Sequence, residues 1–241
     1  MLKALYRYEM DKLLHSGRFV LPGLLLFAFL GISYAIAPLD ILDSFAICAL
    51  VVFALMLSVG VMLGGLRALF IEQTMLVKLR RKAALYLGKV LAVAVVSLTF
   101  AFVSALAPLL VDALSGGHLF TRAIAFSDIA SGLVLFWLAG LCGGMLGLLA
   151  NPRLIRSRRF AVLFSALLGL LSIVKGALIK GSAAMKFVLW VLPPVYDASV
   201  ACSAGETFSL GSAFAPLLWL AAYAAAETAA YVLLMRARRF E

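Results

Sequence analysis

Polar side chains are scarce in this sequence of 241 residues. It has a single asparagine (Asn151) and a single glutamine (Gln73), and only 13% of its residues are charged. Hydrophobic residues make up 65%, against about 45–50% in ordinary soluble domains. They form unbroken blocks, whereas the strands of a membrane barrel alternate apolar and polar residues. The composition therefore predicts an all-α integral membrane protein.

The sequence also lacks the residue patterns of catalysis and metal binding. Its three cysteines are far apart and show neither zinc-site spacing nor a disulfide framework. The two histidines, His15 and His118, fall in segments expected on opposite sides of the membrane. A Gly-x-x-x-x-Gly-Lys-Ser/Thr motif is absent, so this chain is not expected to bind ATP. We predict that it is not an enzyme and that it has no catalytic residues, no metal site and no cofactor of its own.

The hydrophobic blocks predict six transmembrane helices. The expected spans are about 19–37, 45–66, 90–111, 129–150, 160–179 and 214–235. The first could instead belong to a cleaved signal peptide, because a charged start precedes it and Ala35-Ile36-Ala37 resembles a cleavage site. Its length and the proline that follows, Pro38, favour a retained span.

The distribution of basic residues predicts the orientation. With both termini in the cytoplasm, 17 of the 21 lysines and arginines lie in cytoplasmic segments. Positive charge accumulates on the cytoplasmic side of membrane proteins, so this arrangement is strongly preferred over its inverse. The net charge of +10 therefore reflects topology and does not predict nucleic-acid binding. The expected location is a bacterial cytoplasmic (inner) membrane.

Two segments outside the spans have distinctive patterns. Residues 1–18 have an apolar helical face with one exception, Glu9, and their basic residues are Lys3, Arg7, Lys12 and Arg18. This pattern is typical of a helix lying in the membrane interface, although an unstructured cytoplasmic tail is the alternative. Residues 180–213 contain an apolar stretch that stops at Pro193-Pro194, too short to cross the membrane. We expect short helices there that re-enter the membrane from the outside.

The longest polar interruption between two spans is the segment 67–89. Its charged residues are Arg67, Glu72, Lys78, Arg80, Arg81, Lys82 and Lys89. In the predicted topology, this segment is a cytoplasmic loop. It is the part of the chain most accessible to a cytoplasmic partner.

Residues 1–18, 70–89 and 180–213 together resemble permeases of the type-2 ATP-binding-cassette (ABC-2) exporter family. The resemblance places Glu72 and Thr74 at the family's Glu-x-Gly-Thr positions, with the glycine missing, and Gly88-Lys89 at its Gly-Lys. It implies an N-terminal interfacial elbow helix at 1–18 and six spans within 19–241. It also implies a coupling loop at 67–89 and re-entrant outer helices between spans five and six. The ATPase-coupling residues would be Glu72, Thr74, Lys78, Arg80, Arg81 and Lys82.

The resemblance also implies partners. They are two copies of a cytoplasmic ABC ATPase that binds Mg-ATP, a second permease (identical or homologous) and membrane lipid. The chain is most similar to short bacterial permeases of peptide-exporting and self-immunity systems. This similarity and the apolar spans favour an amphipathic peptide or another hydrophobic cargo. Lipid, drug or polysaccharide export by the same family is the alternative.

Glu227 is the ionisable residue deepest within a predicted span. A charge at the bilayer centre costs about 2.5–3.5 kcal/mol on insertion scales, so the side chain should face protein or water. It could line the transport path or pair with Arg67 at the inner mouth. It could equally be a protonated or hydrogen-bonded packing residue. A third hypothesis is that Glu227 is the proton or ion site of a secondary transporter.

Small residues recur every three or four positions in three of the predicted spans. They are Gly60 and Gly64; Gly140, Gly143, Gly144 and Gly147; and Ala222, Ala226 and Ala230. Such faces let helices approach closely in lipid. Packing within one chain is the first interpretation, and a subunit interface is the second.

Overall fold

The computed structural model describes residues 2–17, 19–35, 38–65, 83–116, 118–151, 155, 157–181, 189–204 and 210–237. The helices are α1 (Leu2–His15), α2 (Val20–Ser33), α3 (Ile41–Gly65), α5 (Ala83–Leu114), α6 (Phe126–Leu149), α7 (Arg158–Gly181), α9 (Val195–Cys202) and α10 (Leu210–Ala237). Within these ranges the chain forms no strand, only an isolated bridge between Leu39 and Phe120. The all-α fold class is confirmed.

Five helices are long and apolar enough to cross a membrane: α3, α5, α6, α7 and α10. They correspond to the predicted second to sixth spans. The predicted first span, 19–37, is not confirmed, because α2 has only 14 residues. At 1.5 Å per residue it is about 21 Å long, less than the ~30 Å hydrocarbon core. A sixth crossing exists only if α1 and α2, bent by 70° at their junction, count as one span.

The helix α5 begins seven residues earlier than the predicted span. Its first residues, from Ala83 to Lys89, belong to the segment that the sequence assigned to a cytoplasmic loop. They are mostly good helix formers, so the helix continues beyond its apolar part. The remainder of that loop, 67–82, lies outside the described residues.

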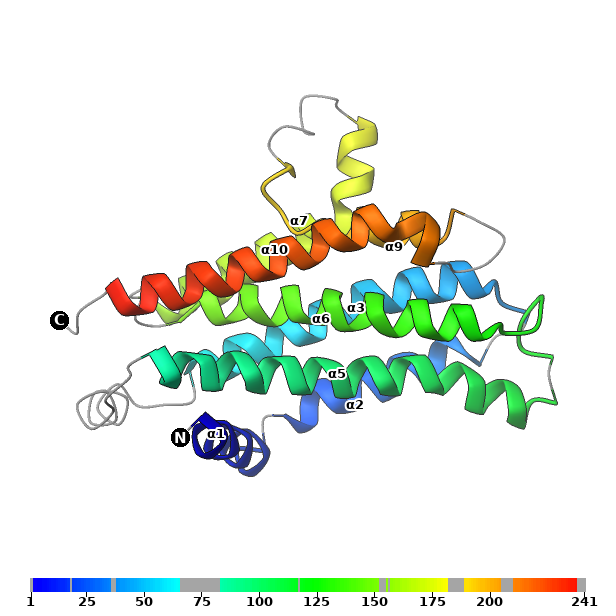
Figure 1. The fold of residues 1–241 in the computed structure, drawn as a ribbon. Helices are drawn as coiled ribbons and strands as arrows, with labels where there is room; N and C mark the ends of the chain where they lie inside the picture. Colours follow the sequence, from blue (N-terminus) through cyan, green and yellow to red (C-terminus); the bar gives the residue numbers. More distant parts are fainter. Residues whose placement is uncertain are drawn as a thin grey trace.

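The helix α6 is the centre of the bundle (Figure 1). It packs against α3, α5 and α10, while α2 packs on α3 and α1 packs on α5. The short helix α9 lies against α3 and α10, with Val195, Ala198 and Cys202 fully buried. Both termini lie toward one end of the bundle, and the turn from α2 to α3 is at the other (Figure 1).

Glycines bring α3 and α6 into backbone contact. A Cβ atom added to Gly143 or Gly147 would overlap the carbonyl oxygen of Phe53 or Leu57 on α3. A Cβ atom added to Gly60 would overlap the carbonyl oxygen of Gly144. In this part of the chain the small residues thus serve packing within one chain, the first of the two interpretations.

Hydrogen bonds join α5 to α6 across the same region. The Ser97 hydroxyl donates to the Trp137 carbonyl at 2.8 Å, and the Trp137 indole donates to the Ala94 carbonyl at 3.1 Å. In lipid these groups have no water as an alternative partner, so the bonds satisfy groups that would otherwise be costly to bury. They fix the rotation of α5 relative to α6.

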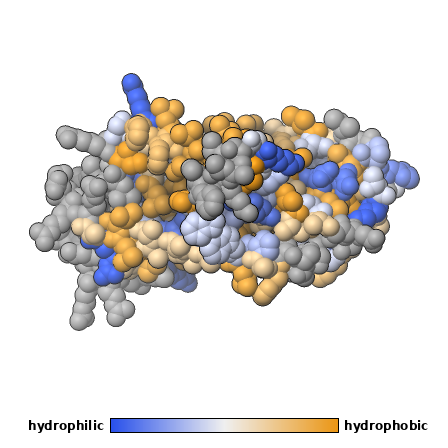
Figure 2. Space-filling view, turned by 90° about the horizontal axis from the view of Figure 1, so that it is seen from above, coloured by the Kyte–Doolittle hydropathy of each residue, from blue (hydrophilic) through white to orange (hydrophobic). Residues whose placement is uncertain are grey.

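The helix α7 exposes much of its apolar surface, and only 28% of its apolar stretch is buried in the bundle. Leu163, Leu167 and Leu170 are 70%, 51% and 58% exposed. Figure 1 shows the last turns of α7 pointing away from the other helices. Apolar residues cover much of the face formed by α7 and α10, and hydrophilic residues gather at the end opposite the termini (Figure 2). This surface is suited to contact with lipid.

At that opposite end, two loops are tied together. The Leu39 amide donates to the Leu119 carbonyl at 2.9 Å, and the Thr121 amide donates to the Leu39 carbonyl at 3.1 Å. Arg122 donates two hydrogen bonds to the fully buried carboxylate of Asp128, at 2.7 and 3.0 Å. These bonds raise the pKa of Arg122 above its usual value. The loops therefore form a fixed cap on α2, α3, α5 and α6.

The Arg122–Asp128 pair supports a first prediction. In the Asp128→Ala variant, the Arg122 guanidinium loses its carboxylate partner, and the Ala125 amide, which donates to Asp128 at 2.9 Å, loses its acceptor. We expect the free energy of unfolding to fall by about 1–3 kcal/mol. Thermal unfolding in detergent would measure the loss. Asp112→Ala, which removes one hydrogen bond from the Leu119 amide, should cost less; an equal loss in both variants would contradict the role of the ion pair.

Candidate functional site

The predicted coupling residues cannot be placed. Arg67, Glu72, Thr74, Lys78 and 80–82 all lie outside the described residues. The described chain resumes at Ala83, the first residue of α5. What the structure does show is the helix crossing that immediately follows this segment.

The helix α1 crosses α5 at Gly88. A Cβ atom added to Gly88 would lie 3.2 Å from the Leu5 Cβ atom, tighter than most such contacts. On α1, Leu13 is fully buried, while Lys3 and Arg7 are exposed. The apolar face of α1 thus packs on α5, and its basic face points away from α5. Of the other predicted basic residues, Lys12 is partly buried and Arg18 lies outside the described residues.

This crossing buries charges of opposite sign. Glu9 on α1 and Lys89 on α5 are both 0% exposed, and each takes part in a polar or electrostatic interaction. Glu9 is one turn after Leu5, and Lys89 follows Gly88, so both belong to the region of closest approach. Burying an ion requires compensation by charge or hydrogen bonds. Sequence reasoning treated Glu9 only as an exception, although an acid on an otherwise apolar helical face was the available signal.

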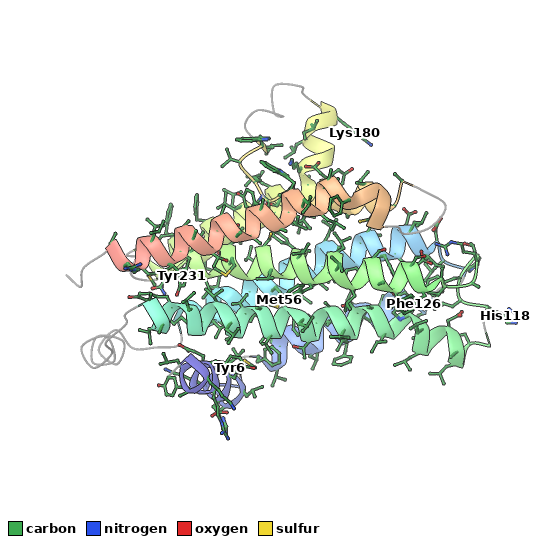
Figure 3. All side chains as sticks on the ribbon, in the orientation of Figure 1. Tyr6, Met56, His118, Phe126, Lys180 and Tyr231 are labelled. Carbon is green, nitrogen blue, oxygen red and sulfur yellow. The ribbon has the colours of Figure 1, made fainter. Side chains whose placement is uncertain are left out.

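The crossing is connected through α5 to α10. Tyr86, one turn before Lys89, packs edge to face against Tyr231, with ring centroids 6.2 Å apart. Both tyrosines are almost fully buried. Tyr231 lies one turn after Glu227 on α10. In Figure 3, Tyr6 of α1 and Tyr231 lie toward the same end of the bundle. The Tyr86–Tyr231 contact therefore joins the region of α5 crossed by α1 to the region of α10 that carries Glu227.

Glu227 is 6% exposed, and neither of its carboxylate oxygens has a hydrogen-bond partner in the described part of the chain. The nearby hydroxyl of Tyr223 donates instead to the Val191 carbonyl. The hydrogen-bonded packing role considered from the sequence is thus not what the described residues show. The pairing with Arg67 stays a prediction, because Arg67 lies outside them.

A buried carboxyl group without a hydrogen bond is costly in an apolar bundle. It is close to Cys142 on α6, whose thiol donates to the Leu220 carbonyl on α10 at 3.6 Å. Ionisable groups inside membrane spans are rare and commonly mark functional sites. Chemically, the site can hold a proton or receive a cation.

The described residues contain no group of three or more His, Cys, Asp or Glu side chains that could hold a metal ion. His118 lies at the end of the bundle opposite the termini (Figure 3), away from α1, which carries His15. The three cysteines are buried as free thiols. The described arrangement therefore offers no nucleophile–base pair built on these residues.

One ion pair within the bundle was not foreseen. Lys175 lies near the end of α7, where a lysine commonly extends toward the lipid headgroups. It is instead 6% exposed, and its ammonium group bonds to Asp197 on α9. The neighbouring Gly176 leaves room for the ring of Tyr196, which a Cβ atom would overlap. These contacts attach α9 to α7, and only the fold brings residues 22 positions apart together.

No protein-family model matches this chain, and comparisons with curated proteins and with solved structures find no significant match.

Proposed function

We propose that this chain is the permease subunit of an ATP-driven ABC exporter of the type-2 family. In this proposal it lies in a bacterial cytoplasmic membrane with both termini in the cytoplasm. It pairs with a second permease, identical or homologous, and two ATPase subunits bind and hydrolyse Mg-ATP. The cargo is hydrophobic or amphipathic, with peptide as the first choice.

The observation that supports this proposal best is the crossing of α1 and α5. An amphipathic N-terminal helix, bent by 70° from α2, lies against the first turns of α5. The basic segment 67–82 ends where those turns begin. A partner that pushes on this segment or on α1 would therefore act on α5 in both cases.

The packing suggests how such a push would travel. A displacement of α5 at Lys89 would move Tyr86 and, through the ring contact, Tyr231 on α10. Packed side chains transmit displacement because they resist compression. Glu227, one turn from Tyr231, would then change its surroundings during the transport cycle.

The coupling segment supports a second prediction. The variant Glu72→Ala, and separately the triple variant Arg80→Ala, Arg81→Ala and Lys82→Ala, should lower permease-stimulated ATP hydrolysis at least tenfold. The reason is that the charged contacts with the ATPase are lost. The measurement is ATPase activity of the purified permease–ATPase complex in vesicles. Lys180→Ala, which removes an exposed cation at the far end of α7, serves as the control.

Normal stimulation in both coupling variants, with the complex still assembled, would show that this segment is not the coupling site. The proposal as a whole would be contradicted if no ABC ATPase encoded beside this chain's gene bound the wild-type chain. In that case the second candidate becomes the better one.

That second candidate is an ATP-independent secondary transporter, and Glu227 is the observation that favours it. A buried carboxyl group without a hydrogen bond is suited to carry a proton through a membrane protein. Flux driven by a proton gradient in vesicles containing only this chain would support it. Export of lipid, drug or polysaccharide is a question of cargo and leaves the ABC proposal unchanged.

A further inference from the structure

The turn between α2 and α3 contains a cavity of about 320 Å³, at the end of the bundle opposite the termini. This is within the size range of small-ligand sites. Two carboxylates, Asp40 and Asp43, lie at its rim, and the apolar side chains of Phe29 and Ile47 line it. Among the described residues that line it, none is a lysine, arginine or histidine.

The walls of the cavity are held in place by contacts with each other and with the neighbouring loop. Tyr34 is 5% exposed and packs edge to face on Phe120, with ring centroids 6.0 Å apart. Its hydroxyl accepts a hydrogen bond from Ser44 at 3.1 Å. Leu39 is fixed by the backbone bonds to Leu119 and Thr121. The cavity is therefore preformed.

The two carboxylates are free to meet a ligand. Asp40 caps α3 by accepting from the Leu42 amide at 2.9 Å with one oxygen, Oδ1, and it remains exposed. Asp43, in the first turn of α3, is also exposed. Arg122 interacts electrostatically with Asp40, but its terminal nitrogens bond to Asp128. The cavity thus keeps negative charge at its rim.

Charge and apolar surface are one helical turn apart. On α3, the apolar Ile47 follows the acidic Asp43 by four residues, and both line the cavity. A turn of helix rises 5.4 Å. A ligand that fits must therefore carry a cation and an apolar group about that far apart.

We propose that this cavity binds a cationic amphipathic peptide. An ammonium or guanidinium group lies between Asp40 and Asp43, and a neighbouring apolar side chain packs against Phe29 and Ile47. The proposal rests on the proposed function for its role, since it makes the cavity the outer site of cargo release. Binding itself does not depend on an ATPase.

The test is equilibrium binding to the purified full-length chain in an uncharged maltoside detergent. The probe is a dansyl-labelled peptide of alternating Lys and Leu, 12 residues long, compared with its Glu/Leu counterpart. We expect the Lys/Leu peptide to bind, and the Asp40→Asn/Asp43→Asn variant to bind it about tenfold more weakly. Asparagine at position 40 still caps the helix, so the fold is preserved.

Two further variants sharpen the result. Asp112→Asn removes an outer carboxylate that bonds to the Leu119 amide and does not line the cavity; it should bind the peptide as the wild type does. The Asp40→Asn/Asp43→Lys variant reverses the charge at the rim and should prefer the Glu/Leu peptide. An unchanged preference in that variant would overturn the proposal.

Other outcomes identify other occupants. Equal weakening by Asp112→Asn would mean a general surface-charge effect, and equal binding of both peptides would mean apolar adsorption. Displacement of the peptide by phosphatidylethanolamine but not by phosphatidylglycerol would assign the cavity to a lipid ammonium group. Each of these results overturns the peptide site. None affects ATPase stimulation, whose absence in the wild-type complex would instead contradict the proposed function.

Discussion

A variant with both Gly143→Ala and Gly147→Ala is expected not to accumulate as a folded membrane protein. Each added methyl group would overlap a backbone carbonyl oxygen of α3, at Phe53 and Leu57. A backbone cannot rotate away as a side chain can, so α3 and α6 must separate. Overpacking usually costs about 1–3 kcal/mol per site, and here the two costs fall on one interface. Fluorescence-detected size exclusion and thermal unfolding in detergent would measure the loss.

The matched control is the double variant Gly23→Ala/Gly31→Ala in α2. Nothing lies within 4 Å of a Cβ atom added at either position. Alanine is favoured over glycine inside a helix by about 1 kcal/mol in water, so this variant should be as stable as the wild type or more stable. If both pairs of substitutions were equally tolerated, the close packing of α3 on α6 would be refuted.

Glu227→Met should raise thermal stability while abolishing transport. Methionine has a similar size and is apolar, so it removes the cost of burying a carboxyl group without a hydrogen bond. The gain should be about 1–3 kcal/mol, the cost of burying a polar group without a hydrogen bond. If Glu227 acts in the transport cycle, cargo export by the permease–ATPase complex in vesicles should fall at least tenfold.

Two variants separate function from packing at this position. Glu227→Asp keeps the carboxyl group and should retain part of the transport activity. Thr228→Val on the same helix removes only a bond to the Ala224 carbonyl of α10 and should leave transport unchanged. Full transport by Glu227→Met would show that this buried acid has no part in the cycle. It would remove Glu227 from both candidate mechanisms.

The sequence predicted those features of the candidate site that depend on residues close together in the chain. The apolar face of α1 followed from the periodicity of residues 1–18, and its basic residues Lys3 and Arg7 are exposed as that pattern requires. Burial of Glu9 and Lys89 depends on how α1 crosses α5, which periodicity does not contain. Glu227 was identifiable as an ionisable residue within an apolar run. Its lack of a hydrogen bond depends on Tyr223, which bonds elsewhere.

The sequence by itself determined the membrane class and the five long apolar helices. These properties depend on the length and composition of continuous segments, because lipid selects segments that bury their own backbone polar groups. The tertiary structure decided which glycines touch, as at Gly143 and Phe53, and which charges pair, as Lys175 does with Asp197. It also formed the cavity at Asp40 and Asp43. Such features join residues that are distant in the chain, and only the packing of helices brings them within contact distance.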